Sequence, residues 1–323
     1  MKLTLLLLMV SWTALAATEE NTHKTLPATP GGMLIVDVDF GSIDVRTNTA
    51  DDCVVVEVWR KITRKNQAAE EQFLRENPVQ FLQKGDTLTV RCRTKALDRW
   101  FGSGRNRNEA KYVIQVPARF NARLHTDGGG IEVSGVSGDV KAETSGGGLR
   151  FTRLHGPVDG NTSGGGIRVA DCESALKIHT QGGGIEVVGG GGSLDGDTSG
   201  GGVTVRNFEG PAEVESSGGG MTIENVHGKV NASTSGGAIH AVLLSPVPGD
   251  VSLTTSGGGV TVKVGAQAAF NLDAKTSGGG VSSDLPVTVL GKVEHGALKG
   301  TVNGGGPAIV LRSSGGGIHI KSL

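Results

Sequence analysis

The sequence predicts an all-β protein, a parallel β-solenoid (β-helix) of about ten short coils preceded by an N-terminal β-rich capping region. Three observations support this fold class: a three-glycine run that recurs every 18 residues, short segments between the runs in which apolar and polar residues alternate, and an aromatic content of only 4%. So few aromatic residues favour a thin core of stacked aliphatic side chains. The formal net charge of −1 provides no basic surface, so we expect no nucleic-acid partner.

Residues 1–16 have the pattern of a secretory signal peptide. Lys2 precedes an apolar run that continues to Leu15, and Ala14-Leu15-Ala16 is a small-x-small cleavage signature. We therefore expect an exported chain, in the periplasm, at the cell surface or extracellular. No later segment approaches the ~18 apolar residues that a membrane span needs, so we expect no transmembrane segment in the mature chain.

Residues 17–30 are polar and contain proline, which predicts a flexible lead-in. Residues 31–120 show no repeat and make up the predicted capping region. Apolar alternation predicts strands at 33–40, 43–45, 54–59, 87–92 and 112–117, and a short helix over 66–76 that ends at Asn77-Pro78. Cys53 and Cys92 fall in two of these strands, either as a disulfide, which export would permit, or as two separate thiols.

A polar loop over residues 98–109 contains Trp100, Phe101, Arg105 and Arg107. Aromatic and arginine side chains are enriched at protein contact sites, so these four residues are the predicted contacts with an unknown protein or glycan at the cell surface. The competing interpretation is that Trp100 folds back onto the capping region and is part of its core.

Residues 121–323 form the predicted solenoid, and each 18-residue unit contains two short strands. The first strand has the pattern apolar-x-apolar, so its middle residue faces solvent. Adjacent coils should therefore place Glu132 beside Arg150. They should likewise place Arg168 beside Glu186, as charge ladders rather than as a catalytic acid pair. The second strand ends in a threonine column that points inward, where each hydroxyl should bond the neighbouring turn. Cys172 lies in an apolar column and is expected to be a buried, unreactive thiol.

The glycine runs are the predicted corners of the coils. A sharp reversal calls for a positive φ, which glycine adopts without strain, and the missing side chains let successive turns stack closely. A substitution such as Gly165→Val should therefore destabilise its coil. A further run begins at Gly304. The predicted structural turn residues are the first glycines of the other runs: Gly128, Gly146, Gly164, Gly182, Gly200, Gly218, Gly236, Gly257, Gly278 and Gly315.

No motif predicts catalytic residues, a cofactor or a metal. Each glycine run precedes a strand rather than a helix, which excludes a phosphate-binding loop. The histidines show no zinc spacing, and only the first run is preceded by the aspartate of a calcium-binding roll, Asp127. The sequence therefore predicts a non-catalytic protein. The alternative is a carbohydrate-active β-helix enzyme, a polysaccharide lyase or hydrolase, with two carboxylates in one cleft.

The repeated Thr-Ser-Gly-Gly-Gly units, the segment 116–118 and the closing segments 298–306 and 313–320 form a further signature. Through these residues the sequence resembles a bacterial family of exported proteins with β-strand repeats, a domain of unknown function named as a "putative adhesin". The resemblance covers nearly all of the mature chain. It implies a right-handed β-solenoid at the cell envelope or surface, an adhesive or structural scaffold that presents its surface to glycans or proteins, and no catalytic residues.

The far end of the array has wider intervals between glycine runs, which predict loops that widen or close the rod there. The final strand, residues 318–320, should expose an unpaired edge. An exposed edge is a template for pairing with another chain, so we expect any homodimer to form through this C-terminal strand.

Overall fold

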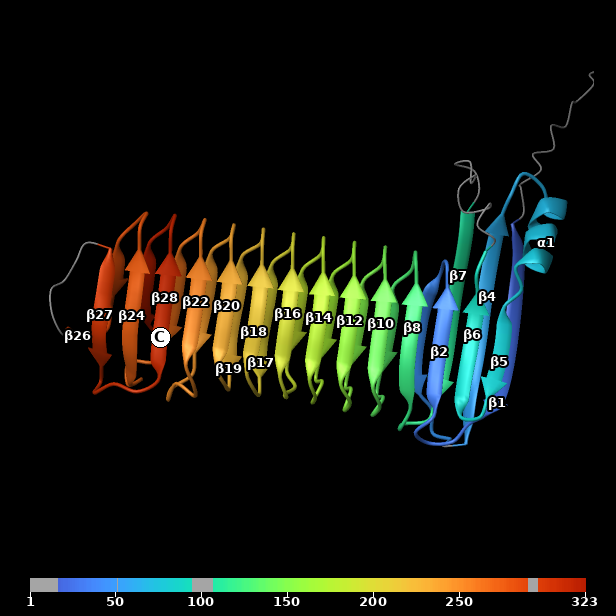
Figure 1. Ribbon diagram of the computed structural model, residues 1–323, viewed down its shortest axis with the longest axis horizontal. Coiled ribbons are helices and arrows are strands. Elements are labelled where there is room, and N and C mark those ends of the chain that lie inside the picture. Colours follow the sequence, from blue (N-terminus) through green and yellow to red (C-terminus); the bar gives the residue numbers. More distant parts are fainter. Residues whose placement is uncertain (1–16, 51, 95–106, 290–295) are drawn as a thin grey trace, which may run out of the picture.

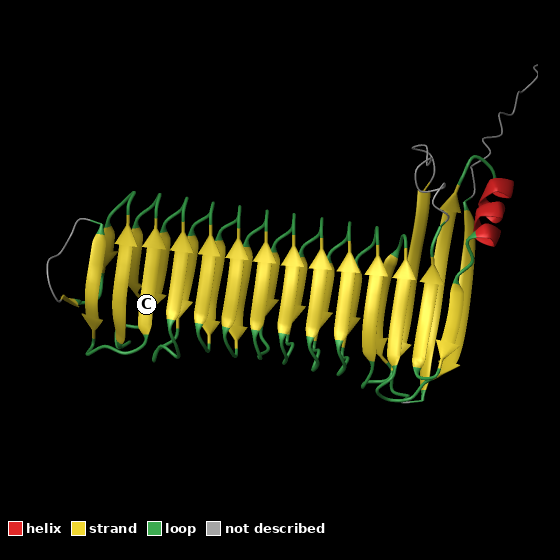
Figure 2. Ribbon diagram, in the orientation of Figure 1, coloured by secondary structure: helices red, strands yellow, loops and turns green. Residues whose placement is uncertain are grey.

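The computed structural model describes residues 17–50, 52–94, 107–289 and 296–323. In these residues the chain forms a long rod of two facing β-sheets, with one helix, α1 (Gln67–Glu76), at the N-terminal end (Figure 1). Strands make up nearly the whole rod and short turns join them along both of its sides (Figure 2). The predicted all-β solenoid is confirmed.

Two sheets run the length of the rod. Sheet A has 14 strands, in the order β1 (Thr18–Pro27), β4 (Cys53–Thr63), β7 (Arg107–Val116), β3 (Ser42–Thr47), β9 (Ile131–Ser134), β11 (Leu149–Thr152), β13 (Ile167–Ala170), β15 (Ile185–Val188), β17 (Val203–Phe208), β19 (Met221–Val226), β21 (Ile239–Leu243), β23 (Val260–Val264), β29 (Ile318–Ser322) and β25 (Val281–Ser283). Sheet B has 15 strands, in the order β5 (Gln80–Lys84), β6 (Thr87–Cys92), β2 (Met33–Val38), β8 (Asn121–Thr126), β10 (Val140–Thr144), β12 (Val158–Thr162), β14 (Leu176–Thr180), β16 (Leu194–Thr198), β18 (Ala212–Ser216), β20 (Val230–Thr234), β22 (Val251–Thr255), β28 (Ala308–Ser313), β24 (Phe270–Thr276), β27 (Ala297–Val302) and β26 (Thr288–Val289).

A coil consists of one strand of sheet B followed by one strand of sheet A, and adjacent coils pair in parallel. The first coil is β2–β3, because β2 pairs with β8 and β3 pairs with β9. The stack therefore begins at Met33, earlier than the boundary at 121 that the glycine runs suggested. The first coil turns through Gly41, which has a φ of 103°, rather than through a glycine triplet, so the repeat pattern did not reveal it.

The capping strands β4–β7 are an insertion in the chain between the first and second coils, and β1 precedes the first coil. β7, β4 and β1 extend sheet A, and β6 and β5 extend sheet B. The flexible lead-in expected at 17–30 is corrected, since β1 pairs antiparallel with β4 along its whole length. Glu70 of α1 accepts hydrogen bonds from the Thr18 amide (3.0 Å) and the Thr18 hydroxyl (2.7 Å) and so anchors the start of β1. The predicted helix is confirmed, with Asn66 as its N-cap.

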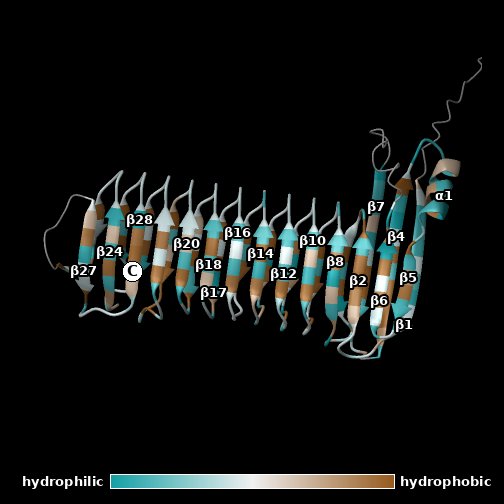
Figure 3. Ribbon diagram, in the orientation of Figure 1, coloured by the Kyte–Doolittle hydropathy of each residue, from teal (hydrophilic) through white to brown (hydrophobic). Residues whose placement is uncertain are grey.

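Apolar and polar residues alternate along the strands (Figure 3), so the apolar half of each strand lines a continuous core between the sheets. The aromatic side chains Phe151, Phe208 and Phe270 of this core are completely buried. Cys172 is also completely buried, as expected, and burial raises the pKa of its thiol. The core is thin because each strand contributes only two or three inward-facing side chains.

The glycine triplets stack on one another at the corner that follows each sheet B strand. A Cβ atom on the middle glycine Gly147, Gly165 or Gly183 would lie 2.2 Å from the carbonyl oxygen of the corresponding glycine in the preceding coil. At the first glycines of the runs, from Gly128 to Gly315 as predicted, the nearest atom would lie 2.6–3.7 Å away. The close stacking of turns is therefore confirmed, and it is strictest at the middle glycine.

The expected positive φ at these corners is wrong for the runs beginning at 128 to 278 and at 315, whose glycines lie outside the left-handed region. Left-handed backbone occurs at the opposite corner, after the sheet A strand. Among the triplet runs considered above, the run at Gly304 differs, because Gly304 and Gly305 are left-handed, and it turns beside the start of β24. The left-handed column recurs every 18 residues: Gly135, Arg153, Asp171, Gly189, Asn207 and Asn225.

The inward threonine column clamps the glycine corners. Thr180 Oγ1 donates to the Gly165 carbonyl of the preceding coil (2.7 Å) and accepts from the Gly183 amide of its own coil (3.2 Å). The same pair of bonds recurs at Thr144, Thr162, Thr198, Ser216, Thr234 and Thr255. The predicted role of this column is confirmed.

The last coil of the chain is not the last coil of the rod. β28 lies between β22 and β24, and β29 lies between β23 and β25. The free edge predicted at 318–320 is therefore wrong, because β29 is paired on both sides. At this end of the rod the edge strands are the short β25 and β26.

Candidate ligand-binding groove

Only one of the four predicted partner-contact residues falls in the described part of the chain. Arg107 is the first residue of β7, where it is exposed and opposite Thr63 of β4. Trp100, Phe101 and Arg105 lie outside the described residues. The Trp-Arg contact site therefore remains a prediction.

A shallow groove of about 900 Å³ follows the outer face of sheet A along the rod axis. We call it the ladder groove. Its floor is the column of third glycines, which have no side chains, and one wall is the column of outward-facing middle residues of the sheet A strands. Its polar lining residues are Ser42, Asp44, Arg46, Lys111, Glu132, Arg150, Arg168, Glu186 and Thr204.

The charges in the ladder groove follow a fixed order set by strand register. Asp44, Glu132 and Arg150 are directly adjacent on successive coils. Arg168 and Glu186 continue the same column. The predicted neighbours are confirmed, and the Arg168 Nε atom lies 3.1 Å from the Glu186 carboxylate. The groove thus has two adjacent acidic residues, then two adjacent arginines, then a further acid.

Arg150 lies at the centre of this column of charges. Its direct neighbours in the column are Glu132 and Arg168, and it is exposed. No ion pair within 4.0 Å involves Arg150 in the part of the chain that the structure describes, whereas Arg168 pairs with Glu186 and Arg46 pairs with Asp44. The centre of the groove is therefore a site where a guanidinium group is available to an anion.

The ladder groove continues onto the capping region through Lys111. A second hollow of about 420 Å³ has Lys111 in common with the groove and includes Trp59, Glu57 and Val113. Trp59 of β4 is directly opposite Lys111 of β7. The sequence analysis did not identify Trp59. The alternation could have done so, because Val54, Val56 and Val58 point inward and place residue 59 on the outer face.

The outer face of sheet B has a different charge pattern. A hollow of about 430 Å³ there is lined by Arg123, Lys141, Asp159, Lys177 and Asp195, which lie on successive coils. The Lys141 ammonium lies 3.1 Å from Glu143 and 3.9 Å from Asp159. Because cations and anions mostly alternate, this face neutralises itself more fully than the ladder groove does.

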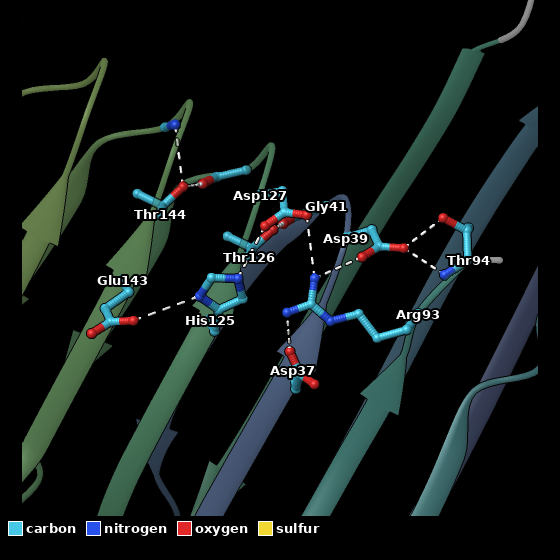
Figure 4. A network of polar contacts seen from close by, with 12 residues as sticks. Asp37, Asp39, Gly41, Arg93, Thr94, His125, Thr126, Asp127, Glu143 and Thr144 are labelled. Carbon is cyan, nitrogen blue, oxygen red and sulfur yellow. Dashed lines mark hydrogen bonds and ion pairs between the residues drawn. The ribbon is translucent and has the colours of Figure 1, made fainter. Parts of the chain in front are cut away.

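A separate polar network joins the capping region to the first coils (Figure 4). Arg93, just after β6, contacts Asp37, and it lies 2.7 Å from Asp39 and 3.2 Å from Asp127. Asp39 also accepts hydrogen bonds from the Thr94 amide and hydroxyl. Burial alone would raise the pKa of Asp39, but the hydrogen bonds from Thr94 and Arg93 outweigh it and hold this pKa below its usual value. The network therefore has a structural role as the joint between the capping region and the first coils.

A buried cluster inside the capping region is also held together by charged side chains and has a structural role. Arg60 is completely buried, contacts Glu20 through two nitrogens and donates to the Asn77 carbonyl (2.6 Å). Cys92 lies against Arg60, and burial raises the pKa of its thiol. Cys53, Cys92 and Cys172 are free, so the structure supports separate thiols at 53 and 92 rather than a disulfide.

Among the described residues, no group of three or more His, Cys, Asp or Glu side chains could hold a metal ion. No helix of the described chain is long and apolar enough to cross a membrane.

The stacked coils, the glycine corners and the polar ladders define a β-solenoid repeat protein. The chain belongs to the family described as Toastrack DUF4097, which matches residues 35–321. No match was found among curated proteins.

Solved structures similar to this chain have low sequence identity to it. A "putative cell adhesion protein" from Clostridium sporogenes has 12% identity and a TM-score of 0.23, over 94% of this chain and 100% of that chain. A "putative adhesin" from Bacteroides fragilis has 14% identity and a TM-score of 0.30, over 94% and 97%. A "putative lipid binding protein" from Parabacteroides distasonis has 12% identity and a TM-score of 0.30, over 94% and 96%.

Proposed function

We propose that this protein is an exported, non-catalytic binding protein of the cell envelope that holds an extended anionic polysaccharide in the ladder groove. The observation that carries the proposal is the adjacent pair Arg150 and Arg168 at the centre of the groove. Guanidinium groups bind carboxylates and sulfates through paired hydrogen bonds, and two on neighbouring coils can contact successive acidic sugars.

The shape of the groove supports a linear ligand. It follows the rod axis from Asp44 to Thr204 and is open along its length, so it suits a polymer rather than an enclosed small molecule. At the capping end, Trp59 provides an aromatic surface on which a sugar ring can stack, and Lys111 provides a second cation beside it. The exposed acid Glu132 is suited to accept hydrogen bonds from sugar hydroxyls, whereas Asp44 is buried and bonded to Arg46.

Export and an adhesive role are parts of the same proposal. Export is supported by the signal-peptide pattern of residues 1–16, which lie outside the described residues. An adhesive or scaffold role is supported by the columnar, repeated character of the surface, which offers many similar contacts instead of one unique cluster. Many weak contacts along a rod give avidity for a polymer with a repeating structure.

The test compares matched charge removals on the two faces of the rod. The double variant Arg150→Ala, Arg168→Ala removes two cations from the ladder groove, and Lys141→Ala, Lys177→Ala removes two from the outer face of sheet B. Purified proteins are measured against an array of neutral and acidic polysaccharides. We expect the first variant to lose most of its binding to acidic polysaccharides and the second to retain it. Equal losses in both variants would contradict the proposed groove.

The enzyme alternative is tested in the same samples. After incubation with each bound polysaccharide, the products are separated by size and assayed for new reducing ends and for unsaturated sugars. Binding without shortening of the polymer supports the binding protein. Shortening that disappears in Asp44→Asn or Glu132→Gln would instead establish a lyase or hydrolase.

A further inference from the structure

The C-terminal segment 308–322 is inserted between two coils that precede it in the sequence. β22–β23 and β24–β25 are joined directly by residues 265–269, yet they do not contact each other as neighbours in either sheet. The inserted coil β28–β29 lies between them, so the two earlier coils are two strand spacings apart. The two earlier coils thus form the walls of a slot that a later segment fills.

The two coils that line this slot make the same backbone hydrogen bonds to the inserted coil as neighbouring coils make elsewhere in the array. The Val260 amide donates to the Gly317 carbonyl (3.0 Å) and the Ile318 amide to the Gly280 carbonyl (2.9 Å). The regular array makes the same bond from Ile239 to Gly259 (3.0 Å). The bonds that hold the insert are therefore generic coil-to-coil bonds, which do not depend on whether the segment belongs to the same chain.

The connection that leads into the insert has the properties of a hinge. Residues 303–307 pass from β27 to β28 beside the start of β24, with Gly304 and Gly305 both at a φ of 87°. This turn is held by side-chain amides: Asn303 donates to the Ala266 and Ala268 carbonyls (2.9 Å each), and Asn271 donates to the Gly306 carbonyl (2.6 Å). Hinge motion at this point would carry the whole segment 308–322 as one unit.

The inserted segment cannot remain free in water once it leaves the slot. Its inward side chains are 0–2% exposed in the rod: Ile309, Leu311, Ile318 and Ile320. A withdrawn segment would expose all four on two strands with unpaired edges. The surface complementary to it in shape, register and hydrogen bonding is the slot itself, so an emptied slot on a second copy is its natural partner.

We propose that this slot is a strand-acceptor site, filled by residues 308–322 of the same chain or, in an exchanged dimer, by the same segment of a second copy. This association is independent of ligand binding in the ladder groove. It replaces the edge-to-edge dimer expected from the sequence with a reciprocal exchange. The closed monomer and the exchanged dimer contain the same coil contacts and differ in the path of residues 303–307.

The test uses variants of the full chain that each have one added cysteine at the slot, while the native Cys92 and Cys172 stay buried in the folded protein. Ser252 of β22 is the direct neighbour of Val310 of β28, on the outer face of sheet B. One preparation has Ser252→Cys and the other Val310→Cys, both with Cys53→Ser because Cys53 is partly exposed. The two are unfolded, mixed at high concentration, refolded together and oxidised. We expect a disulfide-linked heterodimer on a non-reducing gel.

The controls separate exchange from non-specific coupling. A mixture of the Ser252→Cys and Asp273→Cys chains should give no more than background. Exchange of residues 308–322 leaves these two residues on the rods of different copies, and even within one rod they stand two strands apart on either side of Val310, about 9.6 Å, beyond the ~7 Å reach of a disulfide. A single chain with both Ser252→Cys and Val310→Cys should cross-link within the monomer and so prove the geometry. If that chain cross-links internally while the mixed chains give only background, the proposed exchange is wrong.

Discussion

The repeat array and the capping region are stabilised by different kinds of contact. In the array, neutral contacts recur in every coil: stacked glycines, threonine clamps and aliphatic columns, with the charges on the outside. In the capping region and its joint, charged groups are buried, with Arg60 0% exposed, Glu70 1% and Asp39 8%. The array should therefore respond locally to substitution and little to pH, whereas the capping region should respond cooperatively and titrate.

The two regions can be observed separately in one sample. After the signal-peptide pattern, the only tryptophans are Trp59 and Trp100, and both precede residue 121. Tryptophan fluorescence thus follows the capping region. Far-ultraviolet circular dichroism is dominated by the more numerous strands of the array.

The largest expected effect lies in the array, at a middle glycine. Gly165→Val places side-chain atoms where even a Cβ would lie 2.2 Å from the Gly147 carbonyl oxygen. We expect a loss of about 4 kcal/mol or more in the free energy of unfolding, measured by circular dichroism. Gly280→Ala is the control, since its Cβ would meet nothing within 4 Å. A Gly165→Val chain that unfolds at the wild-type denaturant concentration would refute the stacking argument.

The next largest effect lies in the capping region, at its buried cation. Arg60→Met leaves the Asn77 carbonyl without its donor and Glu20 without its partner, so we expect a loss of about 3 kcal/mol in denaturant unfolding followed by tryptophan fluorescence. Arg75→Met is the matched control, because Arg75 of α1 and its partner Glu71 have side chains that are 69% and 46% exposed, and it should cost less than about 1 kcal/mol. Similar losses of unfolding free energy in both variants would contradict the larger stabilising role assigned to the buried arginine.

A smaller, graded effect is expected from pH. Hydrogen bonds outweigh burial and hold the pKa values of Asp39 and Glu70 below their usual range. A carboxyl group whose pKa is lower in the folded state stabilises the fold above its unfolded pKa and loses this contribution as the pH falls through the folded pKa. From about pH 4.5 downwards, the fluorescence transition should therefore move to lower denaturant concentration while the dichroism of the array changes less.

The variant Asp39→Asn sharpens this comparison. It cannot titrate, so its fluorescence transition should depend less on pH than that of the wild type over the same range. An unchanged slope in the Asp39→Asn chain would assign the acid sensitivity to other carboxyl groups.

The smallest effect distinguishes the two corners of a coil. Arg153 has a φ of 50°, which strains an ordinary side chain, so Arg153→Gly should stabilise the array by about 0.5 kcal/mol. Arg150→Gly makes the same change within a strand and should destabilise by about 0.5–1 kcal/mol. Circular dichroism measures the unfolding of both variants. If both changes in the free energy of unfolding had the same sign, the assignment of left-handed strain to this corner would be contradicted.

The repeat could be predicted because its signals are local and recur. A period of 18 with inward apolar pairs was enough to predict the strands, the outward charge columns and the inward threonines. The ladder groove was partly predictable, since Glu132, Arg150, Arg168 and Glu186 follow from register. Trp59 and Lys111 were missed as its extension, because they come from antiparallel strands whose pairing is not periodic.

Two reasons predicted glycine at the corners, and only the close stacking of turns holds, because the positive φ is wrong. Glycine is required there by the distance to the next coil, and this distance exists only once the coils have stacked. The left-handed corner escaped notice because Arg153 and Asp171 replace the glycine or asparagine that would have marked it. The first coil escaped notice for a related reason, since no triplet follows β2.

Sequence alone was enough to establish a stacked solenoid, because every unit repeats the same pattern and can bury its apolar face only against another unit. The order of the last three coils was decided by the tertiary structure. Strands β22, β24 and β28 have the same pattern of inward-facing apolar residues, and each can pair with either of the others. The local sequence therefore does not determine their order in the sheet. Only the paths of residues 265–269 and 303–307 place the C-terminal segment between its predecessors.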